Sequence, residues 1–205
     1  MLAVLFTVIG YLVGSIPIAY LAGRMAGRNL LTEGSGGVSG TAAIERLGLV
    51  SGSLAGLADA LKPVVVVLVV QHAGGYEVSA VAGLVTVVGH IWPVTLRFRG
   101  GRGIGPAGGV LAALGAWHMV LAFAGLVFGK VVMKDSAPGV LIGFVLTSIT
   151  LSLIGASETL ILTAWALLGV LVVGRLVGYR KRPRPRDVSL ATLLWRRLIL
   201  DRDRN

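Results

Sequence analysis

The sequence predicts an all-α membrane protein, a compact bundle of about seven transmembrane helices of which two are short. Apolar residues make up 55% of the 205 residues and charged residues only 14%, whereas soluble domains carry about a quarter charged residues. Several apolar segments reach the ~20 residues that cross a bilayer. This composition excludes an ordinary soluble domain and a disordered chain. The absence of Cys excludes a disulfide-stapled secreted module, zinc fingers and thiol catalysis.

Six segments have the length and apolar character of a membrane span. They are 2–22, 47–70, 78–96, 107–133, 138–154 and 159–177. The fourth is long and interrupted near Gly115, so we expect two short helices there. The first lacks a basic leader and a cleavage site, which favours a retained span over a signal peptide. We therefore expect a helical bundle over 1–178 and a basic tail over 179–205.

The distribution of basic residues predicts how the spans are oriented. Lys and Arg gather in the connections 24–46 and 97–109, after the fourth segment, and beyond residue 175, whereas 71–77 and 155–158 carry none. Basic connections stay in the cytoplasm, so the C-terminus is expected inside and the N-terminus outside, with an odd number of crossings. Splitting the fourth segment gives seven. The net charge of +10 then indicates contact with anionic membrane lipids rather than with nucleic acid.

Two glycine-rich cytoplasmic connections could bind phosphate. The first contains Gly34, Ser35 and Gly36, with Arg46 near a helix start; glycine lets backbone N–H groups turn towards an anion. A flexible connection is the equally simple alternative. The second intersperses arginines, which bind phosphate in a bidentate manner, with glycines, although arginines are expected at any cytoplasmic span end. Its members include Gly100, Gly101, Arg102 and Gly103.

Ionisable side chains inside spans are costly and usually pair within the bundle. Asp59 and Lys62 are spaced i, i+3 on one helix face, which predicts a mutual ion pair beside a kink at Pro63; a functional role is the alternative. His90 is interpreted as a structural hydrogen-bonding residue rather than a base. A further polar cytoplasmic cluster surrounds Ser136.

Four blocks of this sequence resemble the bacterial integral-membrane acyl-phosphate:glycerol-3-phosphate acyltransferases. They are Gly14-Ser15-Ile16-Pro17, Gly34-Ser35-Gly36, Asp59-Ala60-Leu61-Lys62, and Gly89-His90-Ile91-Trp92-Pro93 followed by Phe98-Arg99-Gly100-Gly101-Arg102-Gly103. The resemblance implies a seven-helix enzyme of the bacterial plasma membrane with its active face in the cytoplasm. Its substrates would be acyl phosphate and glycerol 3-phosphate, its products lysophosphatidic acid and phosphate, and it would need no metal or cofactor.

The resemblance also implies roles for individual residues. Ser35 and Arg102 would be the catalytic residues, and Asp59, Lys62 and His90 would be structural or supporting. The residues implied to bind substrate phosphate are Gly34, Gly36, Arg46, Gly100, Gly101, Gly103 and Ser136.

Several positions depart from the family pattern. Gly37 and Ala42 replace asparagines, and Glu45 stands where the family has Arg. The C-terminal His and Asn of the family fall on Lys181 and Arg184. A second hypothesis is therefore a catalytically degenerate member that acts as an accessory or lipid-binding subunit of a larger membrane complex. A small-solute transporter is the third, although no internal symmetry supports it.

Overall fold

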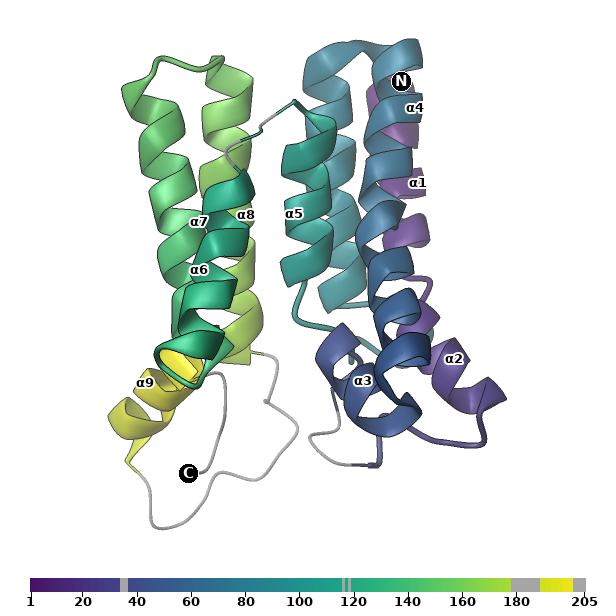
Figure 1. Cartoon of the computed structure of the whole chain (residues 1–205). Helices are drawn as coiled ribbons and strands as arrows, with labels where there is room; N and C mark the ends of the chain where they lie inside the picture. Colours follow the sequence, from purple (N-terminus) through teal and green to yellow (C-terminus); the bar gives the residue numbers. More distant parts are fainter. Residues whose placement is uncertain (34–36, 116, 118, 178–188, 201–205) are drawn as a thin grey trace. The chain divides into compact units, whose positions relative to one another are not determined.

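The computed structural model describes residues 1–33, 37–115, 117, 119–177 and 189–200. The chain divides into two compact units, Met1–Ala116 and Trp117–Asn205, each of which is described by itself. Both units consist of α-helices over the described residues (Figure 1).

The first unit contains two antiparallel membrane-length helices within one continuous element. Its elements are α1 (Leu2–Gly14), α2 (Ile18–Met25), α3 (Gly40–Leu47), α4 (Leu49–Ile91), the 3₁₀ turn η1 (Val94–Leu96) and α5 (Ile104–Ala113). α4 reverses direction at Gly75, whose φ of 83° and ψ of 178° suit glycine (Figure 1). The two expected spans at 47–70 and 78–96 thus correspond to the two arms of α4. Tyr76 Oη, next to the reversal, donates to the carbonyl of Leu114 at 3.1 Å, which ties the turn to the end of α5.

The expected first span is interrupted. α1 ends at Gly14 and α2 begins at Ile18, so the helix does not continue unbroken over 2–22. Pro17 explains the break, because it has no N–H and its ring collides with the carbonyl one turn earlier in a continuous helix. The break leaves backbone carbonyls at residues 14–16 that need donors from elsewhere.

Glycines allow α1 and the second arm of α4 to approach closely. A Cβ on Gly14 would lie 2.1 Å from the carbonyl oxygen of Thr86, and one on Gly89 would lie 2.3 Å from that of Tyr11. Such contacts are typical of membrane helices, whose association depends on close packing because lipid gives no hydrophobic driving force between them. Part of the glycine surplus in the composition is therefore a packing requirement.

The second unit also uses glycines to bring two helices close together. It consists of α6 (Met119–Val131), α7 (Ser136–Leu153), α8 (Glu158–Val177) and α9 (Leu190–Leu200). Gly125 and Gly129 of α6 face Gly139 and Gly143 of α7, and a Cβ on Gly139 would lie 2.2 Å from the carbonyl oxygen of Gly125.

The predicted interruption of the segment 107–133 is confirmed, since α5 ends at Ala113 and α6 begins at Met119. The expected boundary between bundle and tail falls in 178–188, outside the described residues, and stays a prediction. The expected loops 24–46 and 97–109 are shorter than their bounds, because α3 and α5 occupy their C-terminal parts.

The described residues contain four helical stretches that are long and apolar enough to cross a membrane, and two shorter apolar helices, judged by length and composition. The long ones are Leu2–Met25, Leu49–Leu96, Ser136–Leu153 and Glu158–Val177, and the shorter ones are Ile104–Ala113 and Met119–Val131. Large apolar side chains on them are exposed, for example Val65 at 59% and Leu162 at 61%. Such faces are suited to lipid rather than to water.

Candidate functional site

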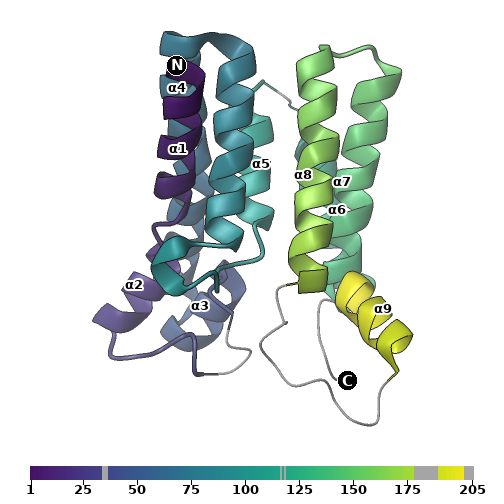
Figure 2. The same cartoon turned by 180° about the vertical axis from the view of Figure 1, so that it is seen from behind.

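The second glycine-rich loop folds back onto the end of α4. The N–H groups of Gly100 and Gly101 donate to the carbonyls of Ile91 and His90, each at 3.1 Å. Arg97 and Phe98 adopt positive φ values of 53° and 62°, which produce the turn. Figure 2 shows this loop at the lower end of the first unit, near α2 and α3.

Glycine is required at 100 and 101 by close packing. A Cβ on Gly100 would lie 2.0 Å from the carbonyl oxygen of His90. One on Gly101 would lie 2.2 Å from His90 Nε2 and 2.6 Å from the carbonyl oxygen of Val38. Val38 follows the first glycine-rich segment and is buried, so the structure brings the two predicted loops into contact. The N–H groups of Gly100 and Gly101 already have acceptors, so their predicted contact with phosphate stays a prediction.

The residues after this loop begin α5. Gly103 is the N-cap, with a φ of 77°, and a Cβ there would lie 2.7 Å from Ile91 Cδ1. Arg102, the predicted catalytic arginine, is half-buried immediately before it. The first N–H groups of a helix lack partners within the helix and carry partial positive charge. Arg102 therefore stands beside a second source of positive potential.

A buried ion pair lies beneath the loops. Lys62 Nζ is 2.8 Å from Asp59 Oδ1, and both side chains are almost fully buried, so the predicted pair is confirmed. The ammonium also donates to the carbonyls of Gly14 at 3.1 Å and Ile16 at 2.6 Å. Lys62 thereby satisfies two of the acceptors that the break between α1 and α2 exposes. Pro63 keeps helical dihedral angles, and within α4 only Gly75 departs from them. The backbone angles therefore give no sign of the expected kink at Pro63.

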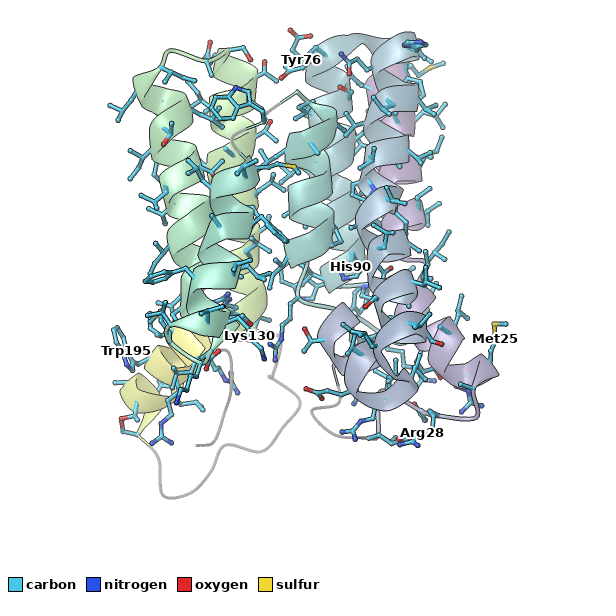
Figure 3. All side chains as sticks on the ribbon, in the orientation of Figure 1. Met25, Arg28, Tyr76, His90, Lys130 and Trp195 are labelled. Carbon is cyan, nitrogen blue, oxygen red and sulfur yellow. The ribbon has the colours of Figure 1, made fainter. Side chains whose placement is uncertain are left out.

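His90, labelled in Figure 3, completes this cluster. It also borders a small cavity. Its Nδ1 lies 3.6 Å from Asp59 Oδ1, too far for a hydrogen bond but close enough for electrostatic attraction. The cavity has a volume of about 10 Å³ and is lined by Gly14, Pro17, Val38, Asp59, His90, Pro93, Gly100 and Gly101. Roughly 10–15 Å³ is needed for one water molecule, so this space suits a water and not a substrate.

The Asp59 carboxylate accepts no hydrogen bond of normal geometry from the described part of the chain, although Lys62 is in ion-pair contact with it. The adjoining cavity has room for a water molecule that could donate to this carboxylate. The expectation that Asp59, Lys62 and His90 support the site stays a prediction.

Two residues that the sequence analysis missed tie the loop to the helix break. Tyr11 Oη donates to the carbonyl of Trp92 at 2.9 Å, and Thr95 Oγ1 donates to the carbonyl of Ser15. Each contact joins residues about eighty positions apart. No sequence pattern pairs a hydroxyl with so distant a carbonyl.

An exposed polar cluster precedes the first glycine-rich segment (Figure 3). Glu33 accepts hydrogen bonds from the Asn29 N–H at 2.9 Å and from Arg28 Nε at 2.8 Å. The Asn29 N–H, and then the Arg28 guanidinium, hold the pKa of Glu33 below its usual value, with a smaller contribution from Arg46. Arg46 thus lies in α3 with its charge near Glu33, whereas Glu45 is exposed.

The remaining predicted site residues lie outside the described part of the first unit. Gly34, Ser35 and Gly36 lie outside the described residues. Ser136 is the first residue of α7, in the second unit, where Asp135 caps the helix by accepting from the Ala137 N–H at 3.0 Å. The predicted roles of these four residues stay predictions.

Comparisons with known proteins agree with the resemblance found in the sequence. The profile of the family described as glycerol-3-phosphate acyltransferase matches residues 4–186. Glycerol-3-phosphate acyltransferase 4 of Dehalococcoides mccartyi (strain CBDB1) is 35% identical over 205 aligned positions, covering 95% of this chain and 86% of its own. The glycerol-3-phosphate acyltransferase of Roseobacter denitrificans is 33% identical over 181 positions, covering 88% and 90%.

The fold is similar to a solved membrane protein. The crystal structure of PlsY (YgiH), an integral membrane glycerol 3-phosphate acyltransferase, in its glycerol 3-phosphate form has a TM-score of 0.79 at 23% identity, covering 88% of this chain and 90% of that one. The lysophosphatidic acid form has a TM-score of 0.77 and the same identity. The chain is therefore a multi-pass, all-α integral membrane protein that belongs to the glycerol-3-phosphate acyltransferase family.

Proposed function

We propose that this protein transfers a fatty acyl group from acyl phosphate to glycerol 3-phosphate, giving lysophosphatidic acid and inorganic phosphate. The observation that carries the proposal is the family match over 4–186, which includes both glycine-rich loops, together with the contact between those loops at Gly101 and Val38. Relatives that cover almost the whole chain carry the name of this activity.

The reaction needs two phosphate-bearing substrates held in line. A hydroxyl oxygen of glycerol 3-phosphate attacks the carbonyl carbon of the acyl phosphate, the bond from that carbon to the phosphate oxygen breaks, and the hydroxyl proton leaves with the phosphate. Phosphate is a good leaving group, so orientation and charge compensation supply much of the rate. Positive groups must offset two phosphates that repel each other.

We assign this charge compensation to Arg102 and the N-terminus of α5. A guanidinium binds phosphate in a bidentate manner, and a helix N-terminus favours an anion. Ser35, with the backbone of Gly34 and Gly36, is proposed to hold the second phosphate. The N–H groups of Gly100 and Gly101 are engaged by carbonyls, so we assign these glycines to holding the loop rather than to contacting substrate. Ser136 remains a proposed phosphate contact from the second unit.

The cluster of Asp59, Lys62 and His90 is proposed to position both loops. Lys62 donates to two carbonyls at the break between α1 and α2. His90 packs against Gly101 of the second loop, which also lies against the carbonyl of Val38. Asp59 and His90 also line the small cavity beside Gly100 and Gly101, which supports a positioning role for the cluster.

We further propose seven crossings of a bacterial plasma membrane, with the N-terminus outside and the loops and C-terminus in the cytoplasm. The basic residues of both loops support this orientation through the positive-inside rule. Seven crossings result when the two arms of α4 and the two short helices α5 and α6 are each counted as one crossing, together with α1, α7 and α8. Contact with anionic lipids is part of the same proposal. Copurification in mild detergent tests for an additional membrane-protein partner.

The test is a coupled assay on the purified protein. With long-chain acyl phosphate and glycerol 3-phosphate, we expect phosphate and lysophosphatidic acid to form in equal amounts. Ser35→Ala and Arg102→Ala should each lower kcat/KM by about 100-fold or more, the loss seen when one transition-state donor is removed. Arg99→Ala, an exposed arginine of the same loop, is the matched control and should keep most of the activity. Folded protein without turnover, accompanied by a stable partner, would instead support the accessory-subunit hypothesis.

A further inference from the structure

The last helix, α9, has an unusual distribution of side chains. Leu193 and Arg197 are its buried residues, whereas Leu190, Leu194 and Trp195 are exposed at 55%, 39% and 63%. The helix therefore leaves three large apolar side chains uncovered by the described residues, and Figure 3 shows Trp195 directed outwards. Water is an unfavourable environment for such side chains. The family model matches residues 4–186, so α9 lies outside the region that the model covers.

Two arginines fix α9 in this orientation. Arg197 donates to the carbonyl of Leu176 at 3.1 Å, and so satisfies an acceptor in the last turn of α8. Arg175, itself buried in α8, donates to the carbonyl of Leu198 at 2.9 Å and to that of Ala137 at 2.8 Å. Trp195 lies two residues before Arg197, which is about 160° around the helix, so these hydrogen bonds direct Trp195 outwards.

The same contacts place α9 at the ends of two spans. Leu176 belongs to the last turn of α8 and Ala137 to the first turn of α7, and both helices are long and apolar enough to cross a membrane. The ends of spans lie where hydrocarbon gives way to headgroups, the level at which Trp is enriched. An apolar helix face at this level meets lipid.

The charge of this segment selects the kind of lipid. Residues 175–205 contain ten basic and three acidic side chains, a net charge of +7 from 10 − 3. Basic segments beside a span are attracted to anionic headgroups. A positively charged segment with an outward apolar helix is suited to lie in the plane of an anionic leaflet.

We propose that α9 is an interfacial anchor, with Leu190, Leu194 and Trp195 inserted at the boundary between headgroups and acyl chains of an anionic leaflet. Arg175 and Arg197 hold it against the ends of α7 and α8. This inference concerns the second unit alone and stands whether or not the chain is an active enzyme.

The test uses the absence of Cys, which makes any introduced Cys unique. A nitroxide spin label is attached to Leu194→Cys in the full chain, in nanodiscs of phosphatidylcholine with and without phosphatidylglycerol. Collisions with oxygen report lipid, and collisions with a water-soluble nickel complex report water. Thr32→Cys, on an exposed loop, is the control for water, and Leu162→Cys, on the exposed face of α8, is the control for lipid.

In anionic nanodiscs we expect the label at 194 to give values between the two controls, at the depth of the headgroup boundary. Without phosphatidylglycerol it should become more accessible to nickel. Equal accessibility at 194 and 32 in anionic nanodiscs would overturn the anchor. Protection from both reagents would also overturn it, because protein would then cover the face, and equal values in the two lipids would overturn the preference for anionic headgroups.

Discussion

Replacement of Lys62 by Met tests the buried cluster most directly. The change removes the counter-ion of a carboxylate that is 3% exposed. It also removes the ammonium that donates to the carbonyls of Gly14 and Ile16, although the Ile16 carbonyl keeps the N–H of Ile18 as a donor. Breaking a buried pair by removing one partner costs about 3–5 kcal/mol. This is a large part of the ~5–15 kcal/mol that typically separates folded from unfolded states. We therefore expect Lys62→Met to lower the free energy of unfolding by about 3–5 kcal/mol.

A double mutant separates the lost ion pair from the lost hydrogen bonds. In Asp59→Leu with Lys62→Met no buried charge is left unpaired, and only the carbonyl bonds are missing, each contributing about 1 kcal/mol. The double variant should therefore recover about 1–3 kcal/mol relative to Lys62→Met, a non-additivity that identifies the unpaired carboxylate as part of the cost. Lys130→Met, an exposed lysine of α6, is the control and should be nearly neutral.

The measurement is reversible unfolding of the purified protein in mixed micelles, followed by circular dichroism, with acyl transfer assayed on the same samples. Lys62→Met within about 1 kcal/mol of the unchanged protein, or simple additivity in the double variant, would refute the reasoning from burial.

Three further predictions use other contacts. Gly139→Ala should destabilise the second unit by about 1–3 kcal/mol, because its Cβ would lie 2.2 Å from the Gly125 carbonyl oxygen. A Cβ on Gly169 of α8 would meet nothing within 4 Å, so Gly169→Ala should be neutral or stabilising. Equal shifts of the thermal unfolding midpoint in the two variants would contradict this. Gly101→Ala should displace the loop from His90 and lower kcat/KM, while Gly108→Ala, with open space around it, should preserve activity; matched activities would argue against loop positioning. The pKa of Glu33 is lowered, so its stabilising contribution is present above its ordinary pKa and is lost as the pH falls through the lower folded value. Glu33→Gln should accordingly raise hydrogen exchange around Asn29 at neutral pH, with the difference from the unchanged protein vanishing in acid; a difference that persisted at low pH would exclude the carboxylate as its cause.

Much of the fold follows from local properties of the sequence. Apolar length, glycine and proline breaks and the distribution of arginines each act over about 20 residues, which is why the spans, the interruption near Gly115 and the pairing of Asp59 with Lys62 could be predicted. The break between α1 and α2 was not predicted, because the apolar run over 2–22 continues through Pro17.

Tertiary structure decided what those segments contact. Lys62 reaching the carbonyls of Gly14 and Ile16, and Tyr11 reaching that of Trp92, depend on the packing of α1 against α4, which no local pattern encodes. The same holds for Gly100 and Gly101: their composition suggested a phosphate loop, whereas their close contact with His90 and Val38 comes from the way the chain folds back. Sequence alone determined which residues are apolar, charged or free of a side chain. The fold determined which of these residues contact one another, because they are distant in the sequence and only packing brings them together.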